Sequence, residues 1–239
     1  MAKRFIKAEM WLVLYLVVQS AIMFGVMVYR INSDVDYMDG LVNSLVKVPT
    51  ESSFISRSVE TAKAISVHLS AVLIPACILS SAVILAIYLI SKWHNARGQV
   101  LSWQETIKYV VYALGANLLI TFIVEILPQT ITSNHQSTTD IALSGSFFMV
   151  LLSTGILVPV MEEIIFRFGM GETIGGKVGL VYQAIIFGLL HGNIVQIIYA
   201  FGLGLWFGVE NMRKQSILPG IIMHITFNAS TVIASTLYK

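Results

Sequence analysis

Charged residues are scarce in this chain. Only 12% of its 239 residues are Asp, Glu, Lys or Arg, whereas a soluble domain carries about 25%. Hydrophobic residues make up 56% of the sequence, and the mean hydropathy is +0.79. This composition excludes an ordinary soluble domain and predicts a polytopic membrane protein. Because no basic tract is interleaved with aromatic residues, we expect no nucleic-acid partner.

Cysteine is almost absent, and several protease motifs are missing. Cys77 is the only cysteine, which excludes an intrachain disulfide and a thiolate metal cluster. The sequence contains no His-Glu-x-x-His zinc motif and no Gly-x-Ser-x-Gly nucleophile elbow. A pair of intramembrane aspartates is also excluded, because the aspartates fall in predicted loops: Asp34, Asp36, Asp39 and Asp140.

Long apolar runs are abundant, and a helix needs about 20 apolar residues to cross a bilayer. They predict an all-α transmembrane bundle of about seven spans, with six or eight as alternatives. The expected spans are Met10–Tyr29, Leu69–Ile90, Ile107–Leu127, Ile141–Met161 continuing to about Arg167, Val178–Leu190, Ile194–Val209 and Ile217–Leu237. The fifth and sixth are short and meet at His191-Gly192-Asn193, so we expect a tight helical hairpin there.

The distribution of basic residues predicts a cytoplasmic N-terminus in the cell membrane. Ten of the 15 Lys and Arg residues fall on the side of the membrane where the expected spans place the N-terminus, and five fall on the other side. We divide the chain into an N-terminal transmembrane region, 1–140, and a helical core, 141–239. The first region has three spans and a long outer loop, 31–64, in which we expect a short amphipathic helix near Tyr37–Val48.

Two adjacent glutamates, Glu162 and Glu163, end the uncharged run Ile141–Met161. A charge in hydrocarbon costs at least ~2.5–3.5 kcal/mol, so intramembrane charges usually mark functional sites. On a helix the two side chains point about 100° apart. Arg167, four residues after Glu163, has the spacing of an ion pair, which leaves Glu162 as a free acid suited to general-base chemistry. This segment alone is equally compatible with a charged cluster at the membrane edge, anchored by Arg167.

Three further polar residues interrupt apolar segments near the C-terminus. His191 ends the run Val181–Leu190, and His224 lies inside the last expected span with Asn228 four residues later on the same face. Together with Glu162 they supply a base, two imidazoles and an amide, the groups needed to activate water and stabilise an oxyanion. The alternative is structural: interhelical hydrogen bonds, each worth about 0.6 kcal/mol in a membrane.

These residues fall into three ordered motifs: Glu162-Glu163-x-x-x-Arg167, Phe187-x-x-x-His191 and His224-x-x-x-Asn228. Over Ile141–Leu237 the chain resembles the CAAX-protease and bacteriocin-processing (CPBP, Abi) family of intramembrane endopeptidases. The resemblance implies that Glu162 activates a water with help from His191, and that His224 and Asn228 hold the oxyanion. Glu163 and Arg167 would brace the site, with Phe187 in support.

The resemblance also implies a reaction and a setting. The family is regarded as glutamate-dependent, so no metal or other cofactor is expected, although Glu162, His191 and His224 are ligand types that leave zinc as an alternative. We expect an intramembrane endopeptidase acting on a membrane-associated peptide or protein, in bacterial pheromone or bacteriocin maturation or in immunity. The alternative is a non-catalytic immunity or scaffold protein that binds a peptide in the same cavity. The oligomeric state is not predicted.

The sequence places His191 and Glu162, which are expected to act on the same water, at different depths in the membrane. His191 falls about 13 residues into its expected span, whereas Glu162 lies near the inner end of its own. Equal depth requires either an offset or re-entrant fifth helix, or a fourth helix that continues past Arg167.

Overall fold

The computed structural model describes residues 1–46, 54–92, 100–143 and 145–237, and these residues form helices and short connections without a strand. The predicted all-α fold is therefore confirmed for this part of the chain. The elements in order are α1 (Ala2–Ser33), α2 (Val35–Val46), α3 (Phe54–Lys92), α4 (Trp103–Ile126), α5 (Gln129–Ala142), α6 (Phe147–Val150), η1 (Leu151–Leu157), α7 (Val158–Glu162), η2 (Glu163–Glu172), α8 (Gly176–Leu189), α9 (Ile194–Lys214) and α10 (Leu218–Leu237).

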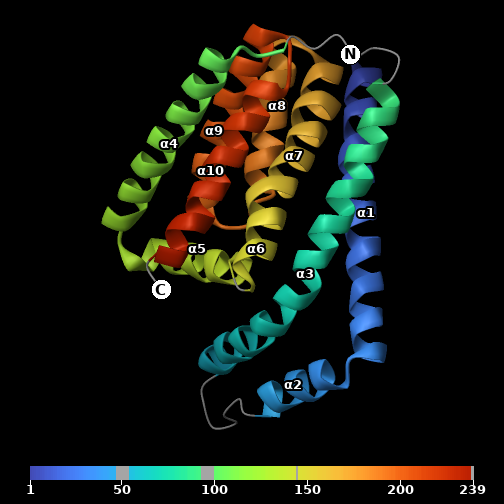
Figure 1. Ribbon diagram of the computed structural model, residues 1–239, viewed down its shortest axis with the longest axis vertical. Helices are drawn as coiled ribbons and strands as arrows, with labels where there is room; N and C mark the ends of the chain where they lie inside the picture. The colour runs from blue at the N-terminus through green and yellow to red at the C-terminus, as the bar shows by residue number, and fades with distance from the viewer. Residues whose placement is uncertain (47–53, 93–99, 144, 238–239) are drawn as a thin grey trace.

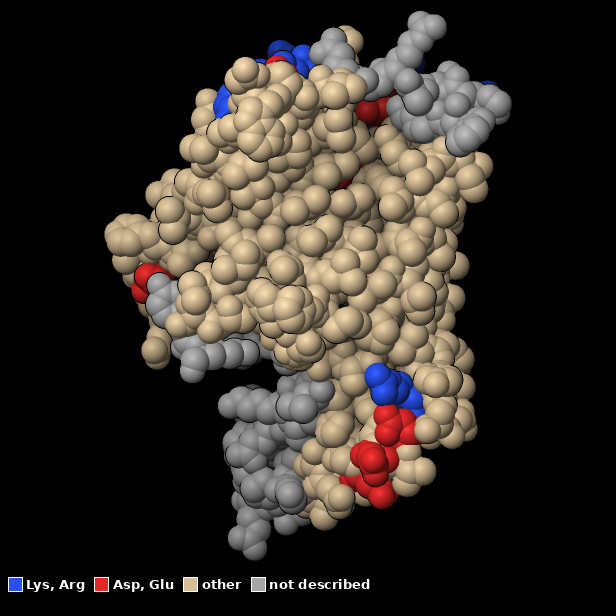
Figure 2. Space-filling view, viewed as in Figure 1, with Lys and Arg blue, Asp and Glu red and all other residues tan. Residues whose placement is uncertain are grey.

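Within the described part of the chain, six helical segments are long and apolar enough to cross a membrane. They are α1, His68–Ser91 within α3, α4, the continuous stretch Phe147–Glu172 (α6 to η2), α9 and α10. In Figure 2 most visible charged side chains gather toward the two ends, with a broad uncharged band between them. The chain is a multi-pass membrane protein, and the number of full spans is at the lower end of the expected range because α8 is too short.

The structure corrects two expected boundaries. The fourth span begins at Phe147 rather than Ile141, because Ile141 and Ala142 end the separate, unpredicted helix α5 and a short break at Gly145 and Ser146 follows. The expected outer loop 31–64 is largely helical in its described residues, since α1 continues to Ser33 and α3 begins at Phe54. The expected short helix within it is present as α2; its last predicted residues, 47 and 48, lie outside the described part.

The helices are arranged around two apolar clusters (Figure 1). α1 and α3 run side by side on one flank, α4 lies beside α10 on the other, and α6–η2, α8 and α9 fill the middle. The first cluster centres on Ile164, Phe166 and Phe187, and the second centres on Tyr109 and Phe207. The bundle therefore has two apolar cores joined through its central helices. The division of the chain near residue 140 stays a prediction.

The short helix α8 resolves the mismatch in depth. Its 14 residues span about 21 Å at 1.5 Å per residue, well below the roughly 30 Å of a hydrocarbon core. The turn at His191 therefore lies partway along the length of the bundle rather than at its far end. In addition, η2 carries the fourth span on to Glu172, past Arg167. Both features bring Glu162 and His191 to the same level, and the two residues line one cavity.

Candidate functional site

The two glutamates lie where the helix changes its hydrogen-bonding pattern. Glu162 ends α7, and Glu163 begins the π-helical segment η2, while a second π-helical segment, η1, precedes α7. Pro159 at the start of α7 has no N–H to donate, which favours a local departure from regular α-helix. π-Helical turns are rare in proteins as a whole, and those that occur are often found at functional sites. This irregular stretch sets the directions of the two carboxylates.

Glu163 is fully buried and is the centre of a polar network. Its Oε2 lies 3.1 Å from Nε of Arg167, so the predicted pair is present. Its Oε1 lies 3.0 Å from Nδ1 of His224, and Asn211 donates to Oε2 at 3.5 Å. An ionised carboxylate in a dry interior requires such partners. Glu163 therefore serves as the buried anion that connects η2, α9 and α10.

His224 contacts both glutamates through opposite edges of its ring. Its Nδ1 faces Glu163, while its Nε2 lies 3.5 Å from Oε2 of Glu162. When Nδ1–H donates to ionised Glu163, Nε2 carries a proton only if the ring is an imidazolium. Nε2 and the Glu162 carboxylate can then share a single proton. The partner that Glu162 lacks on its own helix is thus supplied by α10.

A small cavity of about 70 Å³ opens beside Glu162 and His191. Its walls are Tyr15, Glu162, Phe166, Phe187, Leu190 and His191. Nδ1 of His191 lies 2.8 Å from the carbonyl oxygen of Phe187; we assign Nδ1–H as the donor, because a carbonyl only accepts. Nε2 of His191 then carries the lone pair. A cavity of this size holds water, between one carboxylate and one basic ring nitrogen.

Phe187 packs against three of the predicted site residues. Its ring centroid lies 4.8 Å from that of His191 and 5.6 Å from that of His224. The guanidinium carbon of Arg167 lies 4.4 Å from the same centroid, within the range of a cation–π contact. On its other side His224 contacts Phe207 of the second cluster. The imidazole is therefore held between rings from the two apolar cores.

Asn228 lies apart from the water-sized cavity. Its Nδ2 donates to the carbonyl oxygen of Thr154 at 3.2 Å. It lines a second cavity, of about 210 Å³, together with Asn117, Tyr199 and Thr231. The structure therefore brings Glu162, His191 and His224 together, with Glu163, Arg167 and Phe187 behind them. Asn228 is one turn further along α10, and its predicted role stays a prediction.

Three residues at the site were not predicted from sequence. Tyr15 reaches the cavity from α1. Asn211 on α9 uses both ends of its amide, donating to Glu163 and accepting from the backbone N–H of Gly220 at 2.7 Å. A Cβ added at Gly220 would lie 2.4 Å from Oε2 of Glu163. None of these residues belongs to a recognisable spacing, so only tertiary packing reveals them.

Gly220→Ala is expected to destabilise the protein by ~1–3 kcal/mol, the usual cost of overpacking. Glu163 cannot move aside without leaving Arg167 and His224. Gly202→Ala is the matched control, because a Cβ there meets nothing within 4 Å. Thermal unfolding of the two variants in detergent measures the difference; equal melting temperatures would contradict the packing described here.

Among the described residues, no group of three or more His, Cys, Asp or Glu side chains is placed to hold a metal ion. In the cluster of Glu162, Glu163 and His224, Nδ1 of the histidine is occupied by its contact to Glu163.

Comparison with known proteins agrees with the motifs. Residues 144–230, just over a third of the chain, match the family model described as type II CAAX prenyl endopeptidase, Rce1-like. No curated protein matched the chain, and no solved structure did. The matched region contains both glutamates, Arg167, both histidines and Asn228. Over residues 144–230, the chain is therefore similar to the CAAX-type endopeptidases, which supports the resemblance that the three motifs carry.

Proposed function

We propose that this protein is an intramembrane endopeptidase in which Glu162 and His224 activate a water and stabilise the charge that forms on the substrate. The similarity of residues 144–230 to the Rce1-like family model supports CAAX-type protease activity in general. The observation that carries the finer proposal is the placement of Glu162 and His191 around one water-sized cavity, with His224 3.5 Å from Glu162.

The ion-pair state of Glu162 and His224 supplies both groups that hydrolysis needs. Glu162, as the carboxylate, removes a proton from the water while the water oxygen bonds to the scissile carbonyl carbon. The carbonyl π electrons move to oxygen, and Nε2–H of the His224 imidazolium donates to this oxyanion. Glu162 then gives its proton to the amide nitrogen as the C–N bond breaks. The products are a carboxylic acid and an amine, and the enzyme returns to its starting charge.

The remaining site residues have positioning roles in this proposal. His191, with Nε2 as acceptor, orients the attacking water. Glu163 holds the tautomer of His224, as a carboxylate behind a histidine does in many sites, and Arg167 neutralises Glu163. Asn228 would be a second oxyanion donor through the amide N–H that Thr154 does not use.

For the substrate we propose a membrane-associated peptide or protein, cleaved from the cytoplasmic side of the cell membrane. Bacterial pheromone or bacteriocin maturation, or immunity to such peptides, is the proposed setting. The support is the CAAX-type activity of the matched family and the excess of Lys and Arg on the side of the membrane that holds the N-terminus.

Peptide cleavage by the purified protein in liposomes tests this function. The panel contains a prenylated CAAX peptide and unlipidated amphipathic leader peptides, each analysed for fragments by mass spectrometry. We expect internal cleavage of at least one leader peptide. Binding without cleavage of any peptide in the panel would favour the scaffold alternative.

A chelator is expected to leave the cleavage rate unchanged, because the proposed steps use only side chains and water. Loss of activity in a strong chelator, followed by recovery with added zinc, would contradict this mechanism and assign the chemistry to a metal.

Asn228→Ala is expected to lower turnover by about 10²–10³-fold, the usual effect of losing one oxyanion donor, with little change in KM. Asn117→Ala is the matched control: Asn117 also donates between helices, to the carbonyl oxygen of Phe227 and to Thr231, but has no proposed chemical role. Steady-state kinetics on both variants separate the two roles. A raised KM with unchanged kcat in Asn228→Ala would make Asn228 a binding residue.

A further inference from the structure

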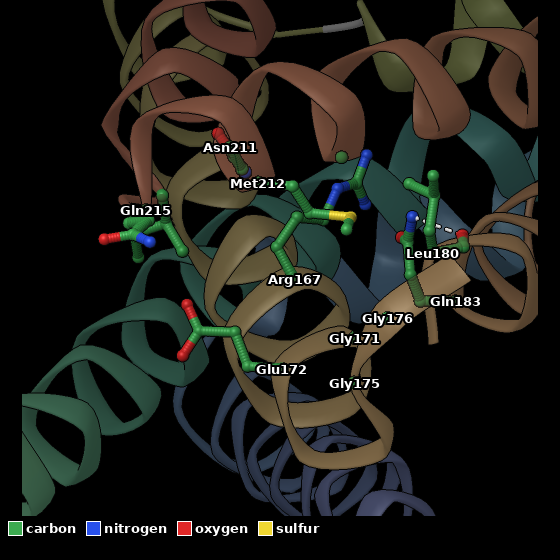
Figure 3. A pocket seen from close by; sticks show the side chains of 12 residues that line it. Arg167, Gly171, Glu172, Gly175, Gly176, Leu180, Gln183, Asn211, Met212 and Gln215 are labelled. Carbon is green, nitrogen blue, oxygen red and sulfur yellow. Dashed lines mark hydrogen bonds between the residues drawn. The ribbon is translucent and has the colours of Figure 1, made fainter. Parts of the chain in front are cut away.

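A cavity of about 380 Å³ lies on the other side of Arg167 from the proposed water site. It is bounded by η2, the start of α8 and the end of α9. Figure 3 shows the guanidinium of Arg167 extending between Met212 and Gln183, above the glycine-rich turn at Gly171, Gly175 and Gly176. The proposed hydrolysis makes no use of this cavity.

Arg167 brings unsatisfied donors to this cavity. The residue is only 3% exposed, yet Nη1 and Nη2 have no hydrogen-bond partner. Nε lies within ion-pair distance of Glu163 but is not aligned for a hydrogen bond. Glu163 is shared with His224 and Asn211, so it cannot saturate a guanidinium with five N–H donors. A buried donor without an acceptor is unfavourable, so a ligand that offers acceptor oxygens would complete the site.

The N-terminus of α8 provides a second set of donors at the same cavity. Gly175 is the N-cap, and no side chain caps the helix, so the first-turn N–H groups keep their capacity to bind an anion. Gly175 and Gly176 have φ values of +82° and +60°, and a Cβ at Gly176 would meet nothing within 4 Å. The turn therefore leaves room beside the helix end.

We propose that this cavity binds the phosphate of an anionic phospholipid. A guanidinium and a helix N-terminus both bind phosphate well, because each presents several N–H donors and a positive charge or dipole. The remaining walls include Leu180, Met212 and Ile217, which suit the start of an acyl chain.

The position in the bundle favours a lipid as the source of the phosphate. The cavity lies among connections between helices, at the end of the bundle that holds the chain's N-terminus, where headgroups lie in a bilayer. Arg4 is beside it, donating to the carbonyl oxygen of Ile174 at 3.4 Å. Glu172 also lines the cavity, but in Figure 3 its carboxylate extends to the opposite side from the Arg167 guanidinium. This inference goes beyond the proposed hydrolysis and does not depend on it.

The test is lipid binding by native mass spectrometry on the intact protein in detergent. Dioleoylphosphatidylglycerol is compared with dioleoylglycerol, which has the same chains and no phosphate. Gly176→Asp places a carboxylate at the helix end, and Gly176→Asn is its neutral match; both residue types tolerate the positive φ. Neither change touches Arg167 or Glu163, so folding of the polar network is preserved.

We expect phosphatidylglycerol to bind at least about tenfold more tightly than dioleoylglycerol. Gly176→Asp should remove most of that preference, and Gly176→Asn should keep it. Equal binding of the two lipids, or equal effects of Asp and Asn, would overturn the proposal. Inorganic phosphate binding as tightly as the lipid would overturn the lipid source. Displacement of lipid by a peptide with a free C-terminal carboxylate, but not by its amidated form, would instead assign the cavity to a peptide.

Discussion

Glu162→Gln is expected to lower the rate of peptide hydrolysis by about 10²–10⁴-fold, the contribution typical of a general base. The substitution keeps the size and planarity of the side chain but cannot accept a proton. It also removes the negative charge 3.5 Å from Nε2 of His224, so the imidazolium that donates to the oxyanion keeps only one of its two carboxylate partners, Glu163. Single-turnover cleavage by purified protein measures the effect independently of product release.

Glu210→Gln is the matched control for this experiment. Glu210 is also a buried glutamate, held by Tyr109 and Arg213, but it does not line the cavity of Glu162. We expect it to change stability and to leave the cleavage rate near that of the wild type. Equal loss of activity in both variants would mean that the rate reports general damage to the bundle rather than the base.

Arg167→Ala is expected to destabilise the protein by ~3–5 kcal/mol, the cost of leaving one partner of a buried ion pair without the other. The side chains of Arg167 and Glu163 are 2% and 0% exposed, so the variant leaves the Glu163 carboxylate buried without its cation. The variant also removes the cation stacked on Phe187. Thermal unfolding in detergent, with expression level as a second readout, measures the loss.

A double-mutant cycle separates the ion pair from the packing of Arg167. Adding Glu163→Gln to Arg167→Ala removes the stranded charge, so part of the stability should return, with a coupling of ~0.5–3 kcal/mol between the two positions. Additive losses would show that the pair contributes nothing beyond the packing of each side chain.

The helices that could be predicted from the sequence are those that contain a long apolar run. Runs of about 20 apolar residues identified α1, α3, α4 and α10, and a shorter run identified α9. The sequence could not show where helices extend beyond the hydrocarbon, as α1 does to Ser33, because polar residues carry no span signal. It also missed α5, whose sequence QTITSNHQSTTDIA is polar and β-branched, a composition that intrinsic helix propensity does not favour.

The candidate site was predicted where spacing on one helix decides the contact. Glu163 and Arg167 pair at four residues, as expected. Contacts between helices could not be predicted from the sequence. It gives no sign that Nδ1 of His224 contacts Glu163 or that Asn211 donates to Glu163. It also gives no sign that Tyr15 lines the cavity. The same limit applies to Asn228, which shares a helix face with His224 but borders a different cavity.

The most direct test of the central claim is incorporation of solvent oxygen during cleavage. Wild-type protein and Glu162→Gln are incubated with a cleaved peptide in H₂¹⁸O, and the new C-terminal carboxyl is analysed by mass spectrometry at early times. If Glu162 activates water for direct attack, the wild type adds one ¹⁸O atom per cleavage and Glu162→Gln produces almost no labelled fragment. Labelled product formed by Glu162→Gln at the wild-type rate would contradict the account, because the water would then be activated by another group.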